Sequence, residues 1–222
     1  MFTVGTNVTF ILDNNITLQG HTGNTSPIVY VGIGMFGANG GTFKMRNGSS
    51  IIGNTSGGVY VSRGTTFEMD GGTISGNTAK HGGGVYLDHD KSTFIITGGT
   101  ISGNTAKHGG GVYAGSAIFN MRGGTITGNT AREYGGGVYI NYYNSKFTKN
   151  GGTITGYNSD PNNGNAVRDD DGNVLARRGH AVFITDNRIF RSGDSTTRKE
   201  TTAGPGVNLS IVENKPTGDW DQ

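Results

Sequence analysis

The feature that most constrains this chain is a nine-residue segment that occurs twice without change. The sequence GGTISGNTA fills residues 71–79 and again residues 98–106. Related segments lie at 48–55 (GSSIIGNT), 123–131 (GGTITGNTA) and 151–156 (GGTITG). A segment that returns every 23 to 28 residues indicates a stack of similar supersecondary units, because each unit buries its apolar face only against its neighbours.

The remainder of each unit repeats as well. An apolar triplet centred on tyrosine follows each glycine cluster, and a segment with alternating apolar residues leads into the next GGT. The triplets begin at Val59, Val85, Val112 and Val138, and the alternating segments begin at Phe43, Phe67, Phe94 and Phe119. Alternation over three or four residues predicts short strands, and the Gly, Asn, Thr and Ser residues between them predict turns.

The glycine content argues against helical folds. Each of the 42 glycines would cost about 1 kcal/mol relative to alanine inside an α-helix, and a collagen helix requires glycine at every third residue. Disorder is consistent with 32% hydrophobic residues but gives no reason for apolar residues to recur in register. We therefore expect an all-β, right-handed parallel β-helix of about six to seven coils, with three short strands per coil and an irregular C-terminal cap.

Three inward-facing rows are expected, because equivalent residues of stacked coils lie about 4.8 Å apart. The first row is Leu18, Ile51, Ile74, Ile101, Ile126 and Ile154. The second is Phe10, Phe43, Phe67, Phe94, Phe119 and Phe147, with Leu12, Met45, Met69, Ile96 and Met121. The third is Val29, Val59, Val85, Val112, Val138 and Val182. Together these rows predict one thin, continuous core.

An asparagine recurs at the corner after each strand of the GGTIS type. These residues are Asn54, Asn77, Asn104 and Asn129. Asparagine tolerates the left-handed backbone region, and its side-chain amide can bond to the equivalent residue one coil away. The row therefore predicts an asparagine ladder, which we expect to end where Tyr157 takes the asparagine position.

The order GGTISGN, GGGVY and FxM resembles the bacterial right-handed parallel β-helix repeat proteins. This group includes the pectate-lyase-like superfamily and surface proteins of the polymorphic outer-membrane or autotransporter-passenger type. The FxM segment departs from the FxxN motif of the polymorphic type. The resemblance implies an extracellular or cell-surface location and a structural, adhesin-like rod, although the group also contains polysaccharide-active enzymes.

The repeats run through the chain without a linker, so a single domain over 1–222 is expected. Within it we expect N-terminal coils over 1–47, regular repeats over 48–156, an inserted loop or hairpin over 157–179, and a last coil with the C-terminal cap over 180–222. The chain has no cysteine, no apolar run long enough to span a membrane and no visible signal peptide. A net charge of +2 gives no reason to expect nucleic acid as a partner.

The acidic residues argue against a polysaccharide-cleaving site. Those within residues 15–156 are Glu68, Asp70, Asp88, Asp90 and Glu133, and they do not recur in register. A glycosidase needs two carboxylates that converge on one bond, so we expect no catalytic residues, no cofactor and no metal site. Asp88-His89-Asp90 could orient an imidazole or hold a metal, but an exposed corner of this kind is more often solvated.

Two columns of outward-facing side chains are candidates for binding. The first is a hydroxyl face similar to that of ice-binding solenoids, and the second is a tyrosine column suited to a glycan or a host or cell-surface protein. The hydroxyl face comprises Thr73, Ser75, Thr100, Ser102, Thr125, Thr127, Thr153 and Thr155, and the tyrosine column comprises Tyr60, Tyr86, Tyr113 and Tyr139, with Tyr30 below them. Alternatively, threonine is simply a good strand former and the tyrosines cover the glycine corners. We expect a monomer or end-to-end association.

Overall fold

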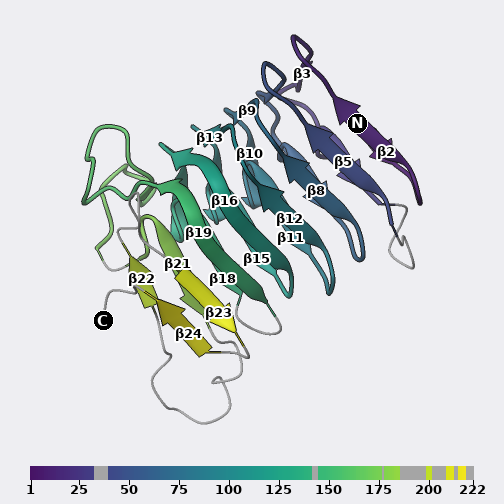
Figure 1. Cartoon of the computed structure of the whole chain (residues 1–222). Helices are drawn as coiled ribbons and strands as arrows, with labels where there is room; N and C mark the ends of the chain where they lie inside the picture. Colours follow the sequence, from purple (N-terminus) through teal and green to yellow (C-terminus); the bar gives the residue numbers. More distant parts are fainter. Residues whose placement is uncertain are drawn as a thin grey trace.

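The computed structural model describes residues 1–32, 40–141, 145–176 and 178–185, together with strands at 199–201, 209–212 and 215–218. These residues form strands and turns without a helix, and the chain winds into a parallel β-solenoid of about five turns. Figure 1 shows the coils stacked from the purple N-terminal strands to the green and yellow C-terminal ones. The predicted fold class is confirmed. The number of coils is slightly smaller than predicted, and the described strands after Thr185 pair antiparallel and add no turn.

Three sheets form the walls of the solenoid. Sheet A contains β1 (Phe2–Val4), β4 (Val29–Val31), β7 (Val59–Val61), β11 (Val85–Asp88), β15 (Val112–Gly115), β18 (Val138–Asn141), β21 (Val182–Thr185) and β22 (Lys199–Thr201). Sheet B contains β2 (Thr9–Leu12), β3 (Thr17–Gln19), β5 (Thr42–Met45), β6 (Ser50–Ile52), β8 (Thr66–Met69), β9 (Thr73–Ser75), β12 (Thr93–Ile96), β13 (Thr100–Ser102), β16 (Ile118–Thr127), β19 (Lys146–Ile154), β23 (Leu209–Val212) and β24 (Lys215–Gly218). Sheet C contains β10 (Thr78–His81), β14 (Thr105–His108), β17 (Thr130–Tyr134) and β20 (Ala166–Val167).

The core consists of the predicted inward rows. Ile101 pairs in register with Ile74 on one side and with Ile126 on the other, and all three side chains are fully buried. The phenylalanine row stacks ring on ring, and the Phe67 and Phe94 centroids lie 4.8 Å apart. Alternation therefore assigns the inward face correctly, because a shift of one residue would turn every side chain of a strand to the other face.

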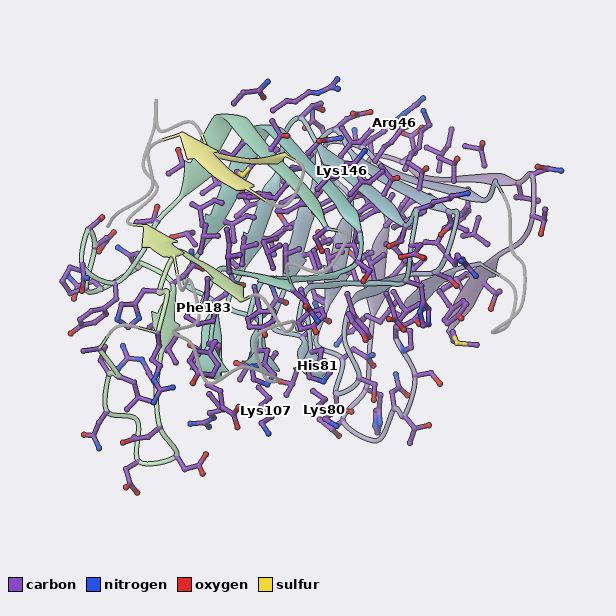
Figure 2. All side chains as sticks on the ribbon, turned by 90° about the horizontal axis from the view of Figure 1, so that it is seen from below. Arg46, Lys80, His81, Lys107, Lys146 and Phe183 are labelled. Atoms are coloured by element: carbon purple, nitrogen blue, oxygen red, sulfur yellow. The ribbon has the colours of Figure 1, made fainter. Side chains whose placement is uncertain are left out.

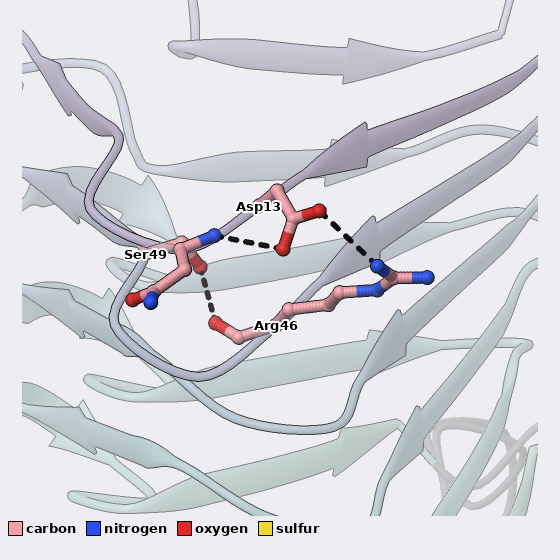
Figure 3. Close-up of polar contacts among 4 residues, drawn as sticks. Asp13, Arg46 and Ser49 are labelled. Atoms are coloured by element: carbon pink, nitrogen blue, oxygen red, sulfur yellow. Dashed lines mark hydrogen bonds and ion pairs between the residues drawn. The ribbon is translucent and has the colours of Figure 1, made fainter.

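The first coil is less buried than the others. Phe10 and Leu18 are only partly buried, although both pack against the core. A corner joins this coil to the next: the Asp13 carboxylate accepts hydrogen bonds from the Asn14 N–H and from the Arg46 guanidinium, and the Ser49 hydroxyl donates to the Arg46 carbonyl (Figure 3). Because the Asp13–Arg46 pair is about half exposed, it contributes little to stability, on the order of 0–1 kcal/mol.

The asparagine ladder is confirmed and extends further than predicted. The Asn77 amide nitrogen donates to Asn104 Oδ1 at 3.0 Å, and the Asn104 amide nitrogen donates to Asn129 Oδ1 at 3.0 Å. The interpretation of Tyr157 as the end of the ladder is wrong, because Asn129 donates in turn to Asn165 Oδ1 at 2.8 Å. The left-handed backbone also lies elsewhere than predicted: the glycine before each of the four predicted asparagines takes it, with φ of 62° at Gly103.

The segment 157–179 consists of two loops separated by a return to the coil. After the first loop, Asn165 resumes the ladder and β20 pairs in parallel with β17. The second loop is a hairpin in which Arg168 bridges Val174, with Gly172 at φ 86° in the turn. An insertion of this kind is tolerated because the ladder and the β17–β20 pairing restore the register on the far side.

The C-terminal end departs from the parallel stack. Strand β22 lies antiparallel to β21, and β23 lies antiparallel to β19, covering the last coil (Figure 1). This end of the chain lies in the segment for which an irregular C-terminal cap was predicted, and within it β23 covers Leu209–Val212. Lys149 continues the methionine row of the core and is buried, and this burial lowers its pKa.

Candidate functional site

The tyrosine column lies on the outer face of sheet A. In each triplet the two flanking residues are buried and the tyrosine between them is partly exposed, except Tyr139, which retains 8% of its exposure. The rings form a continuous column with centroid distances of 4.7 Å for Tyr30–Tyr60, 5.2 Å for Tyr60–Tyr86, 5.2 Å for Tyr86–Tyr113 and 5.0 Å for Tyr113–Tyr139. The first and last pairs are stacked, whereas the two pairs that include Tyr86 meet edge to face. The structure therefore brings the predicted tyrosines together along the rod.

A second aromatic column, which the sequence analysis missed, lies against the first. His81, His108 and Tyr134 stack on one another at the ends of β10, β14 and β17, with centroid distances of 5.4 and 6.0 Å. We call these three residues the histidine column. The signal was present in the sequence, because TAKHGGGVY occurs unchanged at 78–86 and 105–113. The strand at the start of each copy contains only one apolar residue, a small alanine, so the alternation of large apolar residues that marks the other strands is lacking there.

Glycine elbows bring the two columns together. Gly109 has φ of 64°, and a Cβ on it would lie 2.4 Å from the Val112 carbonyl and 3.0 Å from the Tyr113 Cα. Only glycine fits so tight a reversal with a left-handed backbone. The chain therefore turns back from sheet C onto sheet A, and the His81 ring comes to 5.0 Å from the Tyr113 ring.

The histidine column covers one side of the tyrosines. His81 also lies 5.9 Å from Tyr86, and His108 lies 5.2 Å from Tyr139. Lys80 and Lys107, which alternate with the inward positions, are exposed, and Figure 2 shows both near His81, away from Arg46 and Lys146 on the opposite side of the rod. The tyrosines are therefore a half-buried aromatic layer between sheets A and C rather than a fully exposed surface.

Burial sets the protonation of the histidine column. Desolvation lowers the pKa of His81, and the neighbouring His108, Lys80 and Lys107 lower it further. Desolvation also lowers the pKa of His108, and Glu133, whose carboxylate lies 3.4 Å from His108 Nε2, only partly opposes this. Both imidazoles are therefore neutral at pH 7, where their stacking costs no charge repulsion.

This protonation predicts that acid destabilises the fold. In the unfolded chain the histidines titrate near their ordinary pKa of about 6.5, whereas in the folded chain they titrate lower. The unfolded state therefore binds more protons below that pH, and the free energy of unfolding falls as the pH falls. We expect thermal melts to show this dependence between about pH 7 and 5. The double variant His81→Tyr/His108→Tyr should weaken it. Tyrosine is chosen because Tyr134 already occupies the third position of the histidine column. His21→Gln is the control, and an unchanged pH dependence in the double variant would contradict the prediction.

A polar pocket opens on the other side of the tyrosines. Its volume is about 270 Å³, and Tyr86 and Tyr113 line it together with the corner at 88–90. The Asp88 carboxylate accepts a hydrogen bond of 2.7 Å from the Tyr60 hydroxyl and lies 3.1 Å from His89 Nε2. Burial and this carboxylate raise the pKa of the Tyr60 and Tyr86 hydroxyls above their ordinary value. The Asp88-His89-Asp90 corner thus lines a pocket, while the His89 and Asp90 side chains are exposed, as expected for a corner of this kind.

The predicted hydroxyl face forms on sheet B, away from the pocket. Thr73, Thr100, Thr125 and Thr153 pair in one column, and Ser75, Ser102 and Thr127 pair in the other. Their side chains are partly buried, as is that of Thr155. Thr127 donates a hydrogen bond of 2.6 Å to the Asn163 carbonyl, so the loop after Ile154 covers one end of this face.

Two further observations concern the described residues only. They contain no group of three or more His, Cys, Asp or Glu side chains placed to hold a metal ion. None of their segments is a helix of the length and apolarity needed to cross a bilayer.

Comparison of the chain with protein-family models, curated proteins and solved structures gave no match. The assignment of a function therefore depends on the aromatic columns, the hydroxyl face and the pocket themselves.

Proposed function

We propose that this chain is a non-catalytic, rod-shaped β-solenoid of a bacterial cell-surface or secreted protein. We further propose that it displays a glycan-binding surface on the outer face of sheet A. The observation that supports binding is the pocket in which Tyr86 and Tyr113 lie beside Asp88 and Asn141. Aromatic faces stack on sugar rings, while carboxylate and amide groups bond to hydroxyls. The resemblance of the repeats to bacterial surface β-helices supports the location.

The rod itself supports a display function. The apolar rows, in which Lys149 continues the methionine row, and the buried asparagine ladder run along the stack, so neighbouring coils form a stiff, quasi-one-dimensional scaffold. The tyrosine column follows the same axis, with one ring per coil. A chain-like ligand lying along the rod would therefore meet equivalent contacts at regular intervals.

The double variant Tyr86→Ser/Tyr113→Ser tests this proposal. We expect it to bind glycans at least about tenfold more weakly than the original chain, corresponding to about 1.4 kcal/mol, as measured by calorimetry on the strongest ligand from a glycan array. Tyr139 is left in place because it is buried, and its loss would disturb the fold.

Thr100→Ser/Thr125→Ser on sheet B is the matched control and should bind as the original chain does. If both double variants bind equally well, the tyrosines are only a structural layer. Circular dichroism and melting curves must show that the tyrosine variant is folded, and a tyrosine variant that unfolds would assign the column to the fold alone.

The polysaccharide-active alternative is favoured by one observation, namely that Asp88 and Asp90 line the same pocket. We expect no cleavage of pectate, alginate or glycosaminoglycan, with or without calcium. Turnover that disappears in Asp88→Asn would replace the binding function with catalysis.

The ice-binding alternative rests on the two hydroxyl columns of sheet B. Thermal hysteresis that is present in the original chain and lost in Thr100→Leu/Thr125→Leu would establish it.

A further inference from the structure

A missing side chain creates the hollow in the polar pocket. In sheet A, Asp88, Gly115 and Asn141 occupy equivalent positions of three successive strands. Gly115 is not among the described glycines with positive φ, so the backbone does not require glycine there. A Cβ on Gly115 would lie 3.0 Å from Tyr113 Cε1. The glycine therefore carries no side chain between Asp88 and Asn141, the Tyr113 ring lies close over it, and all four residues line the pocket.

The size of the hollow fits one sugar ring. The strands that carry Asp88 and Asn141 are two steps apart, which corresponds to about 9.6 Å between the two positions. Tyr86 and Tyr113 form one wall, with their rings nearly perpendicular at a centroid distance of 5.2 Å. A pyranose placed between the two polar side chains would thus contact an aromatic face, which is a common arrangement for sugars.

The chemistry of the hollow favours a ligand that donates hydrogen bonds and carries positive charge. Asp88 retains 26% of its side-chain exposure and lies 3.1 Å from His89 Nε2. Arg63, which also lines the pocket, pairs with the neighbouring Asp90 carboxylate at 3.6 Å. Asn141 Oδ1 is buried and accepts no hydrogen bond among the described residues. A carboxylate and an unsatisfied carbonyl oxygen are both acceptors, and aromatic faces attract cations.

Resting on the proposed glycan-binding function, we propose that this pocket is a subsite for a pyranose with a free amino group, whose ammonium group pairs with Asp88. The ring packs against Tyr86 and Tyr113, beside the Asn141 side chain. An N-acetylated sugar lacks the charge, and a uronate would be repelled by Asp88. The hollow thus selects amino sugars within the class of glycans that the outer face of sheet A binds.

Calorimetry at about pH 6 with three hexasaccharides tests the proposal: glucosamine, N-acetylglucosamine and galacturonate oligomers. We expect the glucosamine oligomer to bind at least about tenfold more tightly than the other two. Asp88→Asn retains the shape and the acceptor for Tyr60 but removes the charge, so it should bring the ratio of glucosamine to N-acetylglucosamine affinity close to one. Gly115→Leu fills the hollow and should abolish the binding of all three, while Thr100→Leu on sheet B should not.

The outcomes distinguish this inference from the proposed function. Equal affinity for the amino and N-acetyl oligomers, or a preference that persists in Asp88→Asn, would overturn the amino-sugar assignment while glycan binding stands. Tighter binding of an oligolysine peptide than of the glucosamine oligomer would overturn the assignment to a sugar. Failure of every glycan on the array to bind would overturn the proposed function itself.

Discussion

Replacing Ile101 by aspartate is expected to abolish cooperative folding. The side chain of Ile101 is fully buried, and it is paired in register with Ile74 and Ile126 on the two neighbouring coils. A carboxylate at this position would be buried without a partner, at a cost of several kcal/mol. Since domains of this size are stable by only about 5–15 kcal/mol, we expect a loss above about 4 kcal/mol, seen as the absence of a cooperative thermal transition.

The neighbouring residue is the control. Thr100 lies on the outer side of the same strand and is partly exposed, so Thr100→Asp should change the free energy of unfolding by less than about 1 kcal/mol. The two variants carry the same new charge one residue apart, and therefore only the direction of the side chain differs. Equal effects would contradict the register of sheet B.

Replacing Asn104 by alanine is the second large expected effect. The Asn104 amide accepts two hydrogen bonds from Asn77, through Oδ1, and donates to Asn129 Oδ1 and to the Ile74 carbonyl. Alanine would leave several of these buried groups without partners, at about 1–3 kcal/mol for each group. We expect a loss of about 2–6 kcal/mol in denaturant unfolding, from the sum of two such groups.

The exposed end of the ladder provides a matched comparison. Asn24 makes a single side-chain bond to the ladder, in which its amide donates to Asn54 Oδ1 at 2.7 Å, and Asn24 itself is exposed. Asn24→Ala should therefore cost about 1 kcal/mol or less. If Asn104→Ala costs no more than Asn24→Ala, water replaces the lost amide and the ladder contributes little to stability.

The sequence alone determined the solenoid, its register and most of its core. The reason is physical: residues of one coil contact the equivalent residues of the next, about 25 positions away, so periodic contacts leave a periodic sequence. Ile101 and Asn104 could thus be assigned to the core and the ladder without coordinates. The ladder residue Asn165 could not, because two loops displace it from the period and only the pairing of β20 with β17 shows where the coil resumes.

The candidate site was decided by the tertiary structure. The tyrosine column was visible as a repeat, but the angle at which the glycine elbows turn sheet C against it was not, and this angle determines that His81 and His108 cover one side of the tyrosines. The pocket likewise depends on Gly115 standing between Asp88 and Asn141 on neighbouring strands. Such a hollow arises from one departure from the repeat, and periodicity carries no information about the place where it is broken.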